Sequence, residues 1–217
     1  MKQINGPSIF PLSGNKAKQL IIFCHGYGSD GNDLIGLANY FQQMLPDAYF
    51  ISPNAPENCP MNPTGFQWFD FMSNDPELIW NKVIDAGKVL DNFIDKKLKE
   101  LNLSDKDLSL IGFSQGTMMS LHVGLRRNIP MNAIVGFSGR IIREDTLKIE
   151  LKSRPPIYLI HGDQDPMVPY QDTLNAGKIL EKSNVNVQTH ISKNTQHSIA
   201  QDGLEIAIKF LHSNYIK

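Results

Sequence analysis

The sequence predicts an α/β fold in which a mainly parallel central sheet is flanked by helices on both faces. Short apolar runs alternate along the chain with longer segments of helical periodicity, as is typical of three-layer α/β domains. Most of these runs are apolar without interruption, which is expected of strands buried on both faces of a parallel sheet. The chain has 217 residues and no repeat, low-complexity tract or linker. Residues 1–217 are therefore expected to form one domain.

The expected elements follow from these two patterns in chain order. Strands are predicted at residues 9–12, 20–24, 48–52, 108–113, 133–137, 157–160 and 185–191. Helices are predicted at residues 33–45, 76–101, 117–126, 171–182 and 200–214. The helix at 76–101 has the clearest start, because Asp75 can cap its first turn and Pro76 suits the first helical position.

Residues 53–74 break the alternation and are predicted to form a long irregular loop. The loop contains four prolines and a cluster of large apolar residues, which are Met61, Phe66, Trp68, Phe69, Phe71 and Met72. Long loops in compact domains are usually functional or disordered, and the aromatic content argues against disorder. Two interpretations remain on composition alone. The loop is either a lid or apolar wall beside a substrate site, or a cover for the edge of the sheet.

Composition excludes several classes of function. The net charge of −1 offers no electrostatic basis for binding nucleic acid. The first residues lack the pattern of a signal peptide, and no apolar run approaches membrane-spanning length. Cys24 and Cys59 provide neither a disulfide framework nor a cysteine-rich metal site. These features predict no nucleic-acid partner, no stable membrane insertion and a cytoplasmic location.

A Gly-x-Ser-x-Gly motif surrounds Ser114, between the predicted strand 108–113 and the predicted helix 117–126. This order of strand, tight turn and helix is the context of a nucleophile elbow. The serine must stand on a sharp turn, so Gly112 and Gly116 are needed where a side chain would obstruct the backbone. The motif also fits a glycine-rich loop with no chemistry, but its context on both sides favours a nucleophile.

A nucleophilic serine needs a general base, and His197 is the best candidate among the histidines. In hydrolases with this elbow the residues run in the order serine, acid, histidine along the chain. His197 lies in the polar loop 192–198, directly after the last predicted strand, from which it can reach Ser114. A structural role is available for each of the other histidines, which are His25, His122, His161, His190 and His212.

The acid that orients the base is expected in the turn after the predicted strand 157–160. Two carboxylates compete there, Asp163 and Asp165. Asp163 is placed to form an Asx turn with its own backbone. Asp165 precedes Pro166, which restricts its conformation. These arguments favour Asp165 only slightly, and both remain candidates.

Attack by Ser114 would create an oxyanion, which needs backbone donors held in place. One donor is expected to be the N–H of Gln115, the residue after the nucleophile. The other should come from the glycine-rich loop 25–31, where the N–H of Tyr27 is the candidate. A phosphate-binding turn is the alternative for this loop, but the spacing of a P-loop or a dinucleotide fingerprint is missing.

With these residues in hand, the sequence resembles the phospholipase/carboxylesterase family of α/β-hydrolases, which includes bacterial carboxylesterases and acyl-protein thioesterases. The stretches that carry the resemblance are His25-Gly-Tyr-Gly-Ser-Asp-Gly, Pro53-Asn-Ala-Pro56, Trp68-Phe-Asp70, Gly112-Phe-Ser-Gln-Gly116, Phe137-Ser-Gly139, His161-Gly-Asp-Gln-Asp-Pro-Met-Val-Pro169 and the loop of His197. They occur in the family's order and cover nearly the whole chain. One departure is visible, since Gln196 stands where the family usually has glycine.

The resemblance implies an α/β-hydrolase fold with Ser114, Asp165 and His197 as catalytic residues. It implies that the backbones of Tyr27 and Gln115 form the oxyanion hole. It also places Trp68 and Phe69 beside the acyl site, and we expect Met61 and Phe66 of the same apolar cluster to bind substrate with them.

The function expected from the resemblance is that of a serine hydrolase, which cleaves esters or thioesters of apolar acyl groups without a metal or cofactor. Its partners would be a small-molecule or lipid acyl ester or an acylated protein, and a second copy of the chain, since family members are often homodimers. A lysophospholipase is the alternative within the same fold. A binding protein that has lost the chemistry is the alternative outside enzymes.

Overall fold

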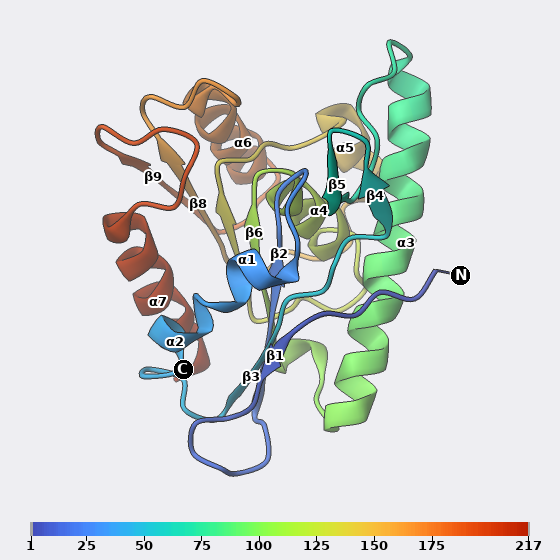
Figure 1. Ribbon diagram of the computed structural model, residues 1–217. Helices are drawn as coiled ribbons and strands as arrows, with labels where there is room; N and C mark the ends of the chain where they lie inside the picture. The colour runs from blue at the N-terminus through green and yellow to red at the C-terminus, as the bar shows by residue number, and fades with distance from the viewer. Residues whose placement is uncertain (1, 217) are drawn as a thin grey trace.

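A computed structural model of the protein describes residues 2–216, and its centre is a seven-stranded sheet (Figure 1). The strand order is β1-β3-β2-β6-β7-β8-β9. Neighbouring strands are parallel except for β1 and β3, which are antiparallel. The bounds are Ser8–Ile9 (β1), Gln19–Cys24 (β2), Ala48–Ile51 (β3), Leu108–Phe113 (β6), Ala133–Phe137 (β7), Ile157–Gly162 (β8) and Val187–Ser192 (β9).

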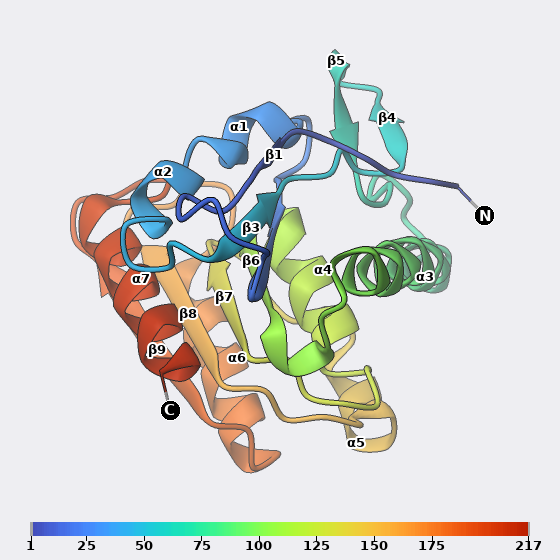
Figure 2. The same cartoon turned by 90° about the horizontal axis from the view of Figure 1, so that it is seen from below.

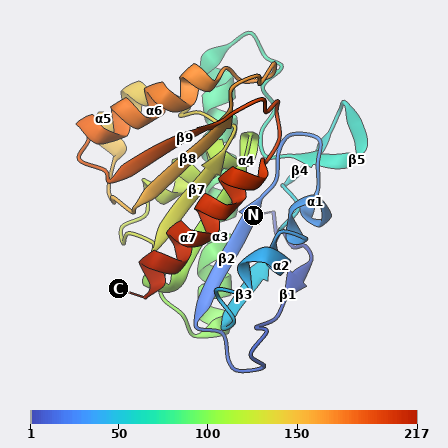
Figure 3. The same ribbon diagram turned by 90° about the vertical axis from the view of Figure 1, so that its left-hand side faces the viewer.

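Helices cover both faces of the sheet (Figures 2 and 3). One face carries α1 (Gly31–Ile35), α2 (Ala38–Phe41) and α7 (Gln201–Tyr215). The other carries α3 (Pro76–Leu101), α4 (Gln115–Gly124), α5 (Leu147–Glu150) and α6 (Tyr170–Lys182). Short 3₁₀ turns at Asp105–Asp107 and Glu144–Thr146 precede β6 and α5. In residues 2–216 no helix is both long and apolar enough to cross a membrane.

Each face of the sheet has its own apolar core, as the uninterrupted apolar strands predict. Leu90 of α3, Met119 of α4 and Leu180 of α6 are fully buried against one face. Phe41 of α2 and Leu211 of α7 are fully buried against the other. The predicted three-layer α/β fold is confirmed, and the parallel strands bring their carboxyl ends to a single edge.

The predicted helix at 33–45 is wrong as a single helix. The structure divides it into α1 and α2, with Gly36 at the end of α1. Asp30 caps α1 by accepting hydrogen bonds from Asn32 and Asp33, so the helix begins two residues before the predicted start. The apolar face was placed correctly, because Leu34 is buried together with the other inward residues of the segment, which are Ala38, Phe41 and Leu45.

The prediction that residues 53–74 form an irregular loop is also wrong. The segment contains an antiparallel hairpin of β4 (Glu57–Cys59) and β5 (Asn62–Gln67). Pro63 and Gly65 weaken the strand signal of β5 in the sequence. The strand forms because it pairs with β4 and because Phe66 bridges to Ser29, far away in the chain.

Candidate active site

Ser114 lies in a sharp turn between β6 and α4. Its φ of 52° and ψ of −115° lie outside the ordinary regions for a residue with a side chain. Its N–H donates to the carbonyl oxygen of Phe137 on the adjacent strand, at 2.8 Å. A Cβ on Gly116 would stand 1.8 Å from the carbonyl oxygen of Cys24, and one on Gly112 would stand 2.4 Å from the nitrogen of Thr117. Both glycines are therefore required by backbone packing around the turn.

His197 follows β9 and contacts only one of the two candidate acids. Its Nδ1 lies 2.6 Å from Oδ2 of Asp165. Asp163 faces the other way, since its Oδ1 accepts a hydrogen bond from Thr195 N–H at 3.3 Å and its Oδ2 lies 3.9 Å from Nζ of Lys193. The structure thus brings together His197 and Asp165, whereas Asp163, in the same turn, faces Lys193 and Thr195.

The carboxylate of Asp165 has no solvent-exposed side-chain surface and is hydrogen-bonded at both oxygens. Oδ1 accepts the N–H groups of Met167 and Val168, at 2.8 and 2.9 Å. Oδ2 is shared by His197 and by Nε2 of His161, which lies 3.0 Å away. Burial disfavours the charged form, but the hydrogen bonds from Val168, His197 and Met167 outweigh it and hold the pKa of Asp165 below its ordinary value.

His161 is a buried neighbour of this pair, and the sequence indicated for it only a structural role at the end of a strand. Its Nε2 faces two acceptors, Oδ2 of Asp165 and the carbonyl oxygen of Val168. We therefore assign the hydrogen to Nε2, so that Nδ1 accepts from the hydroxyl of Thr173 at 2.7 Å. Burial lowers the pKa of His161, which favours this neutral form. A polar residue at the carboxyl end of a buried parallel strand is the signal that could have identified it.

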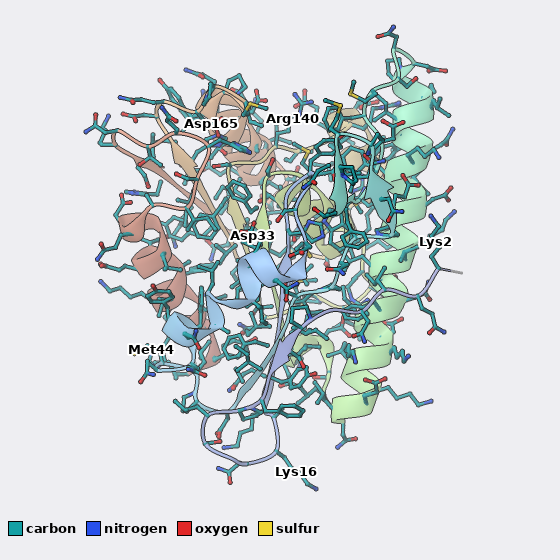
Figure 4. All side chains as sticks on the ribbon, viewed as in Figure 1. Lys2, Lys16, Asp33, Met44, Arg140 and Asp165 are labelled. Carbon is teal, nitrogen blue, oxygen red and sulfur yellow. The ribbon has the colours of Figure 1, made fainter. Side chains whose placement is uncertain are left out.

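Ser114 and His197 line one cavity of about 720 Å³ at the carboxyl edge of the sheet. Figure 4 shows Asp165 and Arg140 at this end of the molecule, with Lys16 at the opposite end. Much of the wall is apolar and is formed by Phe69, Phe71, Ile79, Phe113, Met118, Ile141, Ile142, Met167, Val168, Ala176 and Ile179. Such a cavity, apolar with a few convergent polar groups, is typical of a small-molecule site.

Tyr27 and Gln115, the expected oxyanion donors, also line this cavity. Gln115 is the first residue of α4, where a backbone N–H has no partner within the helix. Within residues 2–216 neither the N–H of Gln115 nor that of Tyr27 donates to a protein acceptor. Two residues whose N–H groups have no protein acceptor in the described part of the chain therefore line the cavity together with Ser114.

Of the four residues expected to bind substrate, only Phe69 lines the cavity. Trp68 is 1% exposed, and its Nε1 donates to the carbonyl oxygen of His25 at 2.9 Å, so it is a buried residue that holds the start of the loop 25–31. Phe66 pairs with Ser29 in a backbone bridge, and Met61 is an exposed residue in the turn of the hairpin. These three residues therefore do not line the cavity, and their role in binding substrate stays a prediction.

Gln196, the visible departure from the family pattern, is exposed and does not adopt a positive φ. Its carbonyl oxygen accepts the N–H of Ser198 at 2.8 Å. Because the backbone at this position lies outside the left-handed region, a residue with a side chain is accommodated without strain.

Comparison with known proteins identifies the family to which this site belongs. Residues 9–215 match the family described as Phospholipase/Carboxylesterase. The chain belongs to the phospholipase/carboxylesterase family. Acyl-protein thioesterase 1 of Saccharomyces cerevisiae is 32% identical over 213 residues, covering 90% of this chain and 92% of the relative. Esterase YpfH of Escherichia coli is 26% identical over 198 residues, covering 90% and 82% of the two chains.

Among solved structures, the crystal structure of esterase PE8 matches this member of the phospholipase/carboxylesterase family with a TM-score of 0.92 and 40% identity. The match covers 97% of this chain and 99% of the other. The expected α/β-hydrolase fold is confirmed, and membership of the family makes the chain a hydrolase.

Proposed function

We propose that the chain hydrolyses carboxylic esters or thioesters of apolar acyl groups through an acyl-enzyme on Ser114. One observation carries the proposal. Ser114 and His197 line the same cavity, while Nδ1 of His197 lies 2.6 Å from the buried carboxylate of Asp165. A serine on a strained turn, a base and an acid that fixes the base are the parts that this chemistry needs.

In the proposed reaction, Asp165 accepts the Nδ1–H of His197, which leaves Nε2 free to act as the base. Nε2 takes the proton of the Ser114 hydroxyl as Oγ attacks the acyl carbonyl carbon. The oxyanion accepts hydrogen bonds from the N–H groups of Tyr27 and Gln115. The imidazolium then protonates the leaving alcohol or thiol, and water releases the acid by the same steps in reverse.

The apolar wall supports an apolar acyl group. A cavity of about 720 Å³ lined by Ile79, Met118 and Ile179 would bury methylene groups, each contributing about 0.8 kcal/mol of transfer free energy. Relatives named acyl-protein thioesterase add support for an acyl thioester, including one on an acylated protein.

A labelling experiment and a substrate panel test the proposal. A fluorophosphonate probe should label the folded wild-type protein, and the substitution Ser114→Ala should abolish labelling and hydrolysis together. Hydrolysis should be measured on p-nitrophenyl esters of increasing acyl length and on an acyl thioester, with kcat/KM expected to rise with length until the cavity is filled. Labelling that survives in Ser114→Ala would refute the assignment of the nucleophile.

A lysophospholipid is the second candidate substrate, and Arg140 is the observation that favours it. Each of the other arginines in residues 2–216 donates a side-chain hydrogen bond, whereas Arg140 donates none. The guanidinium of Arg140 forms an ion pair with Asp172 at 3.6 Å. It lines the cavity, where a guanidinium could receive a phosphate. Arg140→Ala should then lower kcat/KM about tenfold for a lysophospholipid and less than about twofold for a neutral ester. Equal effects on both substrates would exclude this candidate.

A non-catalytic binding protein, the alternative outside enzymes, would fail the labelling test above. Two further expectations stay predictions. Homodimer formation and a cytoplasmic location require measurements of solution mass and of cellular distribution.

A further inference from the structure

The hairpin β4–β5 is attached directly to the loop that carries Tyr27. The N–H of Gly28 donates to the carbonyl oxygen of Phe66, and the N–H of Phe66 donates to the carbonyl oxygen of Ser29, both at 2.8 Å. Nδ2 of Asn62 donates to the carbonyl oxygen of Gly28 at 2.7 Å. The two residues that follow Tyr27 are thus held by three hydrogen bonds from one strand.

Two neighbours fix the geometry of this attachment. Oδ1 of Asn62 accepts the N–H of Thr64 at 3.3 Å and its hydroxyl at 3.0 Å, which directs Nδ2 toward Gly28. A Cβ on Gly65 would stand 2.1 Å from the carbonyl oxygen of Gly28. The hairpin can approach the loop this closely only because residue 65 is a glycine.

The same segment of chain also holds the second oxyanion donor. The side chain of Gln115 is 2% exposed; its Oε1 accepts the N–H of Trp68 at 2.8 Å, and its Nε2 donates to the carbonyl oxygen of Phe69 at 2.7 Å. Residues 62–69 therefore contact the loop of Tyr27 at one end and the residue after Ser114 at the other.

We propose that residues 62–69 form a brace that sets the distance between the N–H groups of Tyr27 and Gln115, with Asn62 as a positioning residue. This inference rests on the proposed function, because it assumes that the N–H groups of Tyr27 and Gln115 bind the oxyanion. An oxyanion hole works only if its donors are fixed before the reaction, since donors that must move lose their advantage over water. The brace supplies that rigidity to a loop that contains three glycines, Gly26, Gly28 and Gly31.

Asn62→Asp is the sharpest test, because it replaces the donor that faces the Gly28 carbonyl with an oxygen. We expect kcat to fall about tenfold or more, with KM changed less than about twofold, since losing an oxyanion donor outright costs about 10²–10³ in kcat. The affinity for a trifluoromethyl ketone, which forms a tetrahedral adduct on the serine, should fall by the same factor. The affinity for the carboxylic acid product should not change.

Asn58→Asp is the matched control. Asn58 lies on β4 of the same hairpin, is exposed, and within residues 2–216 its side chain makes no hydrogen bond. The control introduces the same charge without touching the loop, so its kcat should stay within about twofold of wild type. Gln115→Glu tests the other end of the brace, because it removes the donor to Phe69, and it should reproduce the fall in kcat at constant KM.

The brace would be refuted if Asn62→Asp behaved like Asn58→Asp, or if its loss appeared in KM and left kcat unchanged. A fall in kcat that merely followed a lowered melting temperature would also refute it, so thermal unfolding of each variant should be measured. Failure of the wild-type protein to react with the fluorophosphonate probe would instead overturn the proposed function and the brace together.

Discussion

Replacing Asp165 by asparagine should switch off the proposed base by placing the hydrogen of His197 on the wrong nitrogen. Oδ1 of Asp165 accepts the N–H groups of Met167 and Val168, so that position must keep an oxygen. The new amide NH₂ would therefore occupy the position of Oδ2, 2.6 Å from Nδ1 of His197, while the Nε2–H of His161 would keep its other acceptor, the carbonyl oxygen of Val168. Because an NH₂ group donates, Nδ1 would have to accept, and the imidazole hydrogen would move to Nε2.

An imidazole with its hydrogen on Nε2 cannot take the proton of the Ser114 hydroxyl. The same change of tautomer in a serine protease costs about 10⁴ in kcat, and at 1.36 kcal/mol per tenfold this is about 5.4 kcal/mol of barrier. We expect Asp165→Asn to lower kcat on a p-nitrophenyl ester by about 10³–10⁴, and to slow fluorophosphonate labelling by a similar factor.

Asp163→Asn is the matched control for this prediction, since it makes the same chemical change two residues away. The carboxylate of Asp163 accepts a hydrogen bond from Thr195 N–H and pairs with the exposed Lys193. Its effect on kcat should stay within about threefold. Retention of more than a tenth of wild-type kcat by Asp165→Asn, or abolition of turnover by Asp163→Asn alone, would refute the assignment of the acid.

Two further predictions concern stability. His122 is 9% exposed, and its Nδ1 has no hydrogen-bond partner in residues 2–216. Burial, together with the charge of Arg126, lowers the pKa of His122 from 6.5 to about 3. Because the folded protein has the lower pKa, the contribution of His122 to the free energy of unfolding is highest above pH 6.5 and declines as the pH falls toward 3. Urea unfolding at several pH values should show a shallower decline for His122→Leu, and parallel curves would contradict this. Gly116→Ala would force a Cβ against the backbone of Cys24 and should lower the free energy of unfolding by at least about 3 kcal/mol. Gly36→Ala is the control, because residue 36 has a helical φ and open space around it, and it should be neutral or stabilise by about 0.4–1 kcal/mol. Similar changes in the free energy of unfolding for both variants would contradict the packing argument.

The elements that were predictable from sequence are those whose signals are local. The strands Leu108–Phe113 and Ala133–Phe137 were predicted with their observed bounds, because each is a short, mainly apolar run. Helix Pro76–Leu101 was bounded correctly because Asp75 accepts the N–H of Glu77 and because Asn102, in the left-handed conformation, ends it.

What sequence reasoning missed depends on contacts between distant residues. β5 contains proline and glycine, and only its pairing with β4 and Ser29 makes it a strand. Asn62 carries no pattern that distinguishes it from other loop asparagines, and its partner Gly28 lies 34 residues away. His161 was identified as the end of a strand, but its contact with Asp165 depends on how the turn after β8 folds back.

Gln115 shows why the elbow and the hairpin cannot be understood separately. Its backbone N–H lies at the start of α4, where it has no acceptor within the helix. Its side chain accepts from the N–H of Trp68 and donates to the carbonyl oxygen of the next residue, Phe69. A glutamate there would lack the donor, and an asparagine would be one methylene too short to make both contacts. Trp68 in turn donates to the carbonyl oxygen of His25, whose ring lies 5.8 Å from the indole, and the next residues of that loop lead to Tyr27. The groups proposed to stabilise the oxyanion thus belong to one hydrogen-bonded network, in which the hairpin is a structural member of the candidate site.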